Sequence, residues 1–208
     1  MSRLLTFSDQ VLFQAKAGCL RLIRVARDVT APSGPQKWPL SCDSPTGEWL
    51  AESKSPLWDP TAPHAERLLQ AGKVQNLRVA SRRIDGCRVP AGGRFSFWKQ
   101  VGWPGRVRGY VRGRELRQGC LIPSVAGGLC QLSNALYDVA LQAGMTIHER
   151  HRHSQIVPGS LAAIDRDATV FWNYVDLQFS APHRFQIGVQ MTADEMIVHL
   201  WRLDENAG

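Results

Sequence analysis

The sequence has few cysteines, and none are spaced as the CxxC pairs of zinc and redox sites are. The five are an odd number and show no paired framework: Cys19, Cys42, Cys87, Cys120 and Cys130. A chain of 208 residues buries a sizeable core without disulfide bonds. We therefore expect reduced thiols and a cytoplasmic location. For Cys19, Cys87 and Cys120, packing is the favoured interpretation.

No run of apolar residues is long enough to span a membrane or to form the core of a signal peptide. Near the N-terminus, Asp9, Gln10 and Lys16 interrupt the apolar residues. Residues 8–28 follow an imperfect helical period, with basic residues on the other side. The pattern predicts an amphipathic helix that does not cross a membrane, and membrane attachment is the less favoured alternative.

Acidic residues are outnumbered, at 18 against 25 Lys and Arg, and the resulting net charge of +7 favours anionic partners. The arginines concentrate between Arg78 and Arg117, and residues 105–119, GRVRGYVRGRELRQG, hold five of them. Such a stretch is compatible with binding RNA or a polyphosphate. No nucleic-acid motif accompanies it, so a solvated pair of strands is the favoured interpretation and nucleic acid an unfavoured partner.

Residue 63 divides the chain into two predicted parts. Residues 31–63 are rich in proline, which interrupts helices and strands, so they are expected to form an irregular connector. Three tryptophans are expected to fix this connector to the rest of the protein: Trp38, Trp49 and Trp58. A helix then begins at Pro63 and ends before Gly86. We expect an N-terminal helix and connector over residues 1–63 and one domain over residues 64–208.

Alternating patterns in this domain predict strands around one helix, Leu132–Ala143. In the strand expected after Met145, His148 points one way and four residues share the other face: Ile147, Glu149, His151 and His153. Further strands are predicted over residues 167–179 and near the C-terminus. The predicted fold class is α+β, a mainly antiparallel sheet packed against a central helix that starts near Cys130.

The start of that helix carries the clearest chemical signal. Cys130 follows Gly127 and Gly128, and the partial positive charge of a helix N-terminus lowers the pKa of a thiol. Histidine follows on the next predicted strand and aspartate on the one after, the order and arrangement of papain-like and transglutaminase-like enzymes. The prediction is Cys130 as nucleophile, His153 as base and Asp167 as the residue that orients it. Amides near the two glycines would bind an oxyanion.

Two other interpretations use the same residues. Cys130 is equally compatible with packing, and a single histidine is more often an ordinary half-buried side chain. A zinc site would take His151 and His153 with Cys130 or Asp167 as further ligand. No second cluster of ligands is present, so zinc is less favoured and no cofactor or metal is expected.

Residues 65–179 resemble the VanW family, named for a protein encoded with glycopeptide-resistance genes. The resemblance rests on GGLCQLSNALYDVALQAGMTIHERHRHS, on DATV and on NLRVASRRIDGCRVPAGGRFSFWKQVG. The sequence departs from the family at Ala126 and Asp165, where glycine is frequent. Beyond the three catalytic candidates, the matched positions are expected to bind substrate: Gly127, Gly128, Gln131, Ser133, Glu149, Arg150, His151, Ser154 and Thr169.

The resemblance implies chemistry on cell-wall peptides or their precursors. Combined with the cysteine signal, it predicts a thiol-dependent acyl transferase or amidase that acts on a small peptide-like or cell-wall-precursor substrate. The alternative from another class is a non-catalytic module that binds an anionic peptide or a glycopeptide-related ligand through Arg150, His151 and His153. The oligomeric state is left open.

Overall fold

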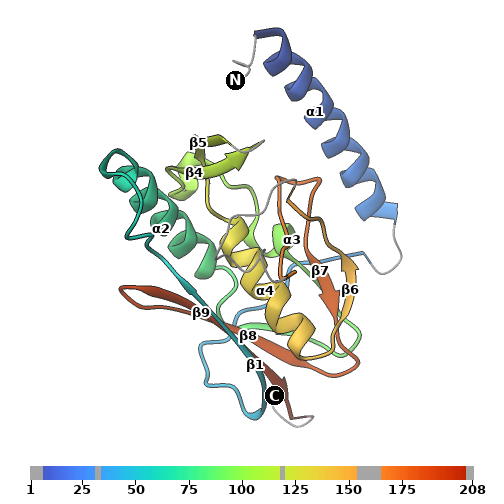
Figure 1. Cartoon of the computed structure of the whole chain (residues 1–208). Helices are drawn as coiled ribbons and strands as arrows, with labels where there is room; N and C mark the ends of the chain where they lie inside the picture. Colours follow the sequence, from blue (N-terminus) through green and yellow to red (C-terminus); the bar gives the residue numbers. More distant parts are fainter. Residues whose placement is uncertain (1–6, 31–33, 118–119, 154–164, 205–208) are drawn as a thin grey trace.

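The computed structural model describes residues 7–30, 34–117, 120–153 and 165–204, and it shows an α+β fold with antiparallel sheets, as predicted (Figure 1). In these residues the helices are α1 (Phe7–Thr30), α2 (Arg67–Ser81), α3 (Phe97–Val101) and α4 (Cys130–Gln142). Single 3-10 turns are η1 (His64–Glu66) and η2 (Arg106–Arg108). The strands are β1 (Gly47–Pro56), β2 (Cys87–Val89), β3 (Arg94–Ser96), β4 (Arg112–Arg117), β5 (Cys120–Val125), β6 (Thr146–Glu149), β7 (Gln178–Ser180), β8 (Phe185–Met191) and β9 (Glu195–Leu203).

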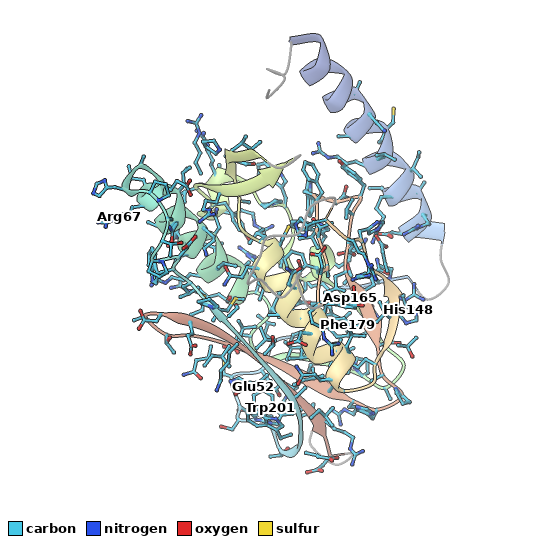
Figure 2. The ribbon with its side chains drawn as sticks, in the orientation of Figure 1. Glu52, Arg67, His148, Asp165, Phe179 and Trp201 are labelled. Carbon is cyan, nitrogen blue, oxygen red and sulfur yellow. The ribbon has the colours of Figure 1, made fainter. Side chains whose placement is uncertain are left out.

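Helix α4 lies at the centre of the fold and packs on a sheet of order β1-β9-β8-β2 (Figure 1). Its apolar stripe is fully buried, with Leu132, Leu136 and Val139 in the core. Glu52 and Trp201 project from the opposite face of this sheet, away from α4 (Figure 2). The predicted packing of a central helix on an antiparallel sheet is confirmed.

Two smaller sheets complete the fold. The sheet β3-β7-β6 lies on the other side of α4, and the hairpin β4-β5 packs on α2 (Figure 1). A Cβ atom at Gly72 of α2 would lie 1.9 Å from the carbonyl oxygen of Arg112. Only glycine allows the helix and β4 to approach this closely.

Helix α1 projects from the body of the protein (Figure 1). The predicted N-terminal helix is therefore confirmed, and no helix within the described residues is long and apolar enough to cross a membrane. Arg24 is buried, whereas Leu22 and Ile23 are exposed. Polar contacts thus join α1 to the rest of the protein, with Arg24 as the buried one among them.

The expectation of an irregular connector is wrong for residues 47–56, which form β1 and pair with β9 along their length. The two sides of the predicted division at residue 63 therefore share one sheet. The tryptophans do fix the connector, since Trp38 Nε1 donates to the Arg94 carbonyl and Trp58 Nε1 to the Ala193 carbonyl.

Two predicted strands are shorter than expected. β6 ends at Glu149, so His151 and His153 do not continue a strand face, and a register shift separates Ile147 from Glu149. The strand predicted over residues 167–179 is confined to β7. Both segments are irregular where their side chains make tertiary hydrogen bonds, and these contacts override the local alternation.

Candidate active site

Cys130 is the first residue of α4, as predicted. The preceding turn needs Gly128, whose φ is +101° and whose added Cβ would lie 2.2 Å from Lys73 Cγ. Gly127 allows a close approach, since a Cβ there would lie 2.5 Å from the Gly113 carbonyl oxygen. The Gly127 N–H donates to the Ser124 carbonyl, whereas the Cys130 N–H has no acceptor in the part of the chain that the structure describes. The helix therefore begins with an amide free to bind a negatively charged atom.

His153 and Asp167 form a two-point contact. The Asp167 carboxylate accepts from the His153 backbone N–H through Oδ2 and pairs with His153 Nδ1 through Oδ1, both at 2.5 Å. The contact occupies Nδ1, which leaves Nε2 as the ring nitrogen that faces other partners. The predicted orienting role of Asp167 thus has the geometry that it requires, although neither residue lies on a regular strand.

The thiol of Cys130 is half-buried beside the segment that follows Asp167. Its Sγ lies 3.5 Å from Thr169 Oγ1 and 3.8 Å from the Val170 carbonyl oxygen. Burial raises the pKa of Cys130, but a hydrogen bond with His153, the charge of His153 and the contact with Thr169 together bring the pKa below its usual value. The site therefore favours the thiolate, the nucleophilic form of cysteine.

The imidazole of His153 is held in its charged form. Its hydrogen bond to Asp167, and then its hydrogen bond to Cys130, raise the pKa of His153 to about 10 against the opposing effect of burial. Burial raises the pKa of Asp167, but the hydrogen bonds and charge of His153 and the charge of Arg150 lower it below its usual value. At neutral pH these shifts favour an imidazolium beside a carboxylate, and the lowered pKa of Cys130 shifts its equilibrium towards the thiolate.

Two neighbouring residues of α4 hold the segment that carries Asp167 and Thr169. The buried Ser133 hydroxyl donates to the carbonyl oxygens of Cys130 and Ala168. Asn134 Oδ1 accepts from the Ala168 N–H at 2.8 Å. Ser133 is among the predicted residues, whereas Asn134 is not. Ser133 and Asn134 are adjacent polar residues within an apolar helix, and buried polar side chains require hydrogen-bond partners. This pattern in the sequence would have identified both residues.

Arg150 supports the same segment from the opposite side. Its Nε donates to the Asp167 carbonyl at 2.6 Å and its Nη2 lies 3.1 Å from Asp165 Oδ1. Its guanidinium stacks 4.9 Å above the ring of Tyr137 on α4. These contacts make Arg150 a residue that positions Asp167, in place of the predicted substrate contact.

The Glu149 carboxylate contacts other residues of the protein and not the thiol. Its carboxylate pairs with Arg24 of α1 at 2.9 Å, and its Oε1 accepts from the Asp176 N–H at 3.1 Å. Arg24 Nη2 in turn pairs with Asp176 Oδ2 at 2.8 Å, and Ser96 and Gln178 also donate to this fully buried carboxylate. Arg24 and Asp176 were not predicted, because Arg24 lies more than one hundred residues in sequence from both Glu149 and Asp176.

The side chains of the other predicted residues that the structure describes contact groups other than the Cys130 thiol. Gln131 Nε2 donates to Ser55 Oγ and the Pro56 carbonyl on β1. The exposed His151 imidazole pairs with Glu149, so it does not share a face with His153. His148 bonds to Ser180 Oγ at 2.7 Å and faces away, as predicted. Ser154 lies outside the described residues.

The predicted zinc arrangement requires His151 and His153 side by side, which the fold does not provide. Within the described ranges, no three or more His, Cys, Asp or Glu side chains are grouped so that they could hold a metal ion.

The two departures from the resembled family coincide with a backbone requirement. Ala126 has φ +64° and Asp165 has φ +61°, the non-glycine residues with positive φ in the described chain. Glycine adopts this conformation without steric cost, which explains its frequency at both positions. The turns before Cys130 and before Asp167 keep the left-handed conformation although the glycine is absent.

Fold and site together define an α+β protein in which a cysteine at a helix N-terminus meets a histidine–aspartate pair. The chain belongs to the VanW family: the family model described as VanW like protein matches residues 72–201. Uncharacterized protein YoaR of Bacillus subtilis is 31% identical over 134 residues, which cover 64% of this chain and 44% of that protein. Vancomycin B-type resistance protein VanW of Enterococcus faecalis is 30% identical over 139 residues, 64% of this chain and 50% of that protein.

The chain thus spans about half the length of the curated relatives that it matches. No solved structure matches it.

Proposed function

We propose that Cys130, His153 and Asp167 carry out thiol-dependent acyl transfer or amide hydrolysis. The observation that supports this most directly is the position of His153, which binds Asp167 through Nδ1 and lies close enough to the Cys130 thiol at the start of α4 for each group to shift the pKa of the other. A thiolate paired with an oriented imidazolium is the activated nucleophile of cysteine hydrolases and transferases.

The proposed reaction needs no group beyond these residues and the substrate. The Cys130 thiolate attacks the acyl carbon, and a C–S bond forms while the negative charge moves to the carbonyl oxygen. The free N–H of Cys130 is placed at the helix start to stabilise such an oxyanion. His153 gives its proton to the leaving amine as the C–N bond breaks. Water or a second amine then attacks the thioester and gives a proton to His153, and the C–S bond breaks to return the Cys130 thiolate.

The substrate class is proposed from one relative. The name of the Enterococcus faecalis protein places that protein in vancomycin resistance. We infer a small peptide-like or cell-wall-precursor substrate for this chain, with the carbonyl bound beside Cys130. The cytoplasmic location expected from the reduced cysteines stays a prediction.

The first test is the rate at which iodoacetamide alkylates Cys130 as a function of pH. Peptide-resolved mass spectrometry separates Cys130 from Cys19 and Cys42, which are exposed. We expect the thiol of the wild-type protein to titrate below the ordinary value of about 8.5, and that of His153→Ala to titrate higher than in wild type, because the hydrogen bond and the charge of His153 are then lost. His148→Ala is the matched control, since His148 bonds to Ser180.

An unchanged titration of Cys130 in His153→Ala would contradict the activated pair. Cys130→Ala tests the remaining alternative. A variant that keeps its circular dichroism spectrum but loses turnover supports the catalytic role, whereas a variant that unfolds shows that the thiol serves packing. A folded variant that still binds a peptide carboxylate would favour the non-catalytic module.

A further inference from the structure

A second pocket, away from the thiol, forms where three distant segments converge. It has a volume of about 440 Å³ and lies between the C-terminal half of α2, the chain at residues 37–40 and the turn of η2 that ends at Gly109. This volume is within the range of small-molecule sites, roughly 300–1,000 Å³. The pocket is therefore large enough for a compact ligand.

Four cationic side chains line this pocket, and its lining includes no acidic residue: Lys37, Arg82, Arg83 and Arg108. Several other buried or half-buried arginines pair with carboxylates, as Arg24 and Arg114 do. In contrast, none of the four has a carboxylate within ion-pairing distance among the described residues. Like charges held together repel, so the cluster is stabilised by an anion that enters it.

Tyr110, which follows the lining residue Gly109, reports on the charge around two of these arginines. Tyr110 is fully buried, and its hydroxyl has no hydrogen-bond partner in the described structure. Burial raises the pKa of Tyr110 to about 12, although the charges of Arg83 and Arg108 act in the opposite direction. Both guanidinium groups therefore lie near the pocket wall, and no acidic group there balances them.

We propose that this pocket binds the phosphate or diphosphate group of a small phosphorylated molecule. Four convergent cations match an anion that carries two or more charges better than they match a single carboxylate. Arginine also suits phosphate because its planar fork donates two hydrogen bonds to a pair of oxygens. A pocket of this size, partly open to solvent, suits a small ligand better than a nucleic acid, which requires an extended basic surface.

Titration calorimetry with inorganic pyrophosphate tests the proposal on the full chain. The pocket variant Lys37→Gln/Arg82→Gln removes two exposed lining charges that make no side-chain hydrogen bond. The matched control Arg78→Gln/Arg106→Gln removes two charges from the same α2 and η2 elements but outside the pocket. We expect saturable binding to wild type and to the control, and an affinity at least about tenfold lower for the pocket variant.

The other outcomes overturn the proposal. If wild type does not bind pyrophosphate saturably, the pocket is not a phosphate site. If both double variants weaken binding equally, the attraction comes from diffuse charge. A parallel titration with a short single-stranded RNA separates the two sources of phosphate: RNA binding with no pyrophosphate binding would assign the basic residues to nucleic acid instead. None of these variants touches Cys130, so the result is independent of the proposed acyl transfer.

Discussion

Arg24 Nη1, on α1, lies 2.9 Å from both carboxylate oxygens of Glu149, at the end of β6. Glu149 is four residues before His153, and Arg24 also pairs with Asp176 in the segment that follows Asp167. The same guanidinium therefore joins the two segments that bring His153 and Asp167 together. The N-terminal helix is part of the support of the site and not only an appendage.

Replacing Arg24 is expected to be far more costly than replacing Arg27, although both contact Glu149. Arg24→Ala leaves the buried Asp176 carboxylate without its cation and half-buried Glu149 with Arg27 alone, and it should lower the free energy of unfolding by about 3–5 kcal/mol. The Arg27 side chain is 65% exposed, so Arg27→Ala should cost less than about 1 kcal/mol. Urea unfolding of both variants measures the difference, and equal losses would show that α1 is not anchored by Arg24.

Ala126→Gly should stabilise the protein. Ala126 adopts φ +64°, which costs a side chain with a Cβ more than it costs glycine, and the gain exceeds the entropy that glycine loses on folding. We expect about 0.5–1 kcal/mol in urea unfolding. Gly128→Ala is the opposite test: its φ of +101° and the nearby Lys73 side chain predict a loss of at least about 1 kcal/mol. A loss in Ala126→Gly would contradict the assigned turn.

Thr169→Val should raise the pKa of Cys130 while His153 stays in place as the charged partner of the thiol. The Thr169 hydroxyl lies 3.5 Å from Cys130 Sγ and helps to lower the pKa of Cys130. The midpoint of Cys130 alkylation against pH should rise in Thr169→Val, by less than in His153→Ala, while Thr169→Ser keeps the wild-type midpoint. An identical midpoint in Val and Ser variants would remove Thr169 from the site.

The sequence was sufficient to predict the parts of the site that depend on local pattern. The apolar period places Cys130 at the first turn of α4, and the two glycines mark the turn before it. Pairing His153 with Asp167 was also predicted, although by way of two regular strands. The structure reaches the same contact through irregular segments, because the Asp167 carboxylate takes the place of a strand partner for the His153 N–H.

What the sequence did not predict depends on contacts between distant residues. Residues 47–56 have proline at one end and carry no strong alternation, yet they form β1 because β9 offers a full register of partners. Arg24 looks like one of several basic residues on an amphipathic helix. Its role comes from the buried Asp176, whose environment of Ser96 and Gln178 no local pattern reveals.

The thiolate–imidazolium pair predicts a specific dependence of stability on pH. His153 has a raised pKa of about 10, so its contribution is fully present below about 6.5 and is lost as pH rises through 10. Cys130 has a lowered pKa, so its contribution is present above about 8.5 and is lost as pH falls. Between these two ordinary values the two slopes have opposite signs, because the His153 contribution falls as the pH rises while the Cys130 contribution grows, so they offset each other.

The contribution of this pair to the free energy of unfolding should therefore change less between pH about 6.5 and 8.5 than from there towards 10, where only the His153 slope acts. Cys130→Ala removes the compensating titration while Asp167 still raises the pKa of His153, so the decline should begin near pH 6.5. His148→Gln is the control, because burial lowers the pKa of His148 and this residue titrates below the window. Urea unfolding across this range gives the comparison. A wild-type curve and a Cys130→Ala curve of the same shape would mean that the thiol stays protonated, and the acyl-transfer proposal would lose its nucleophile.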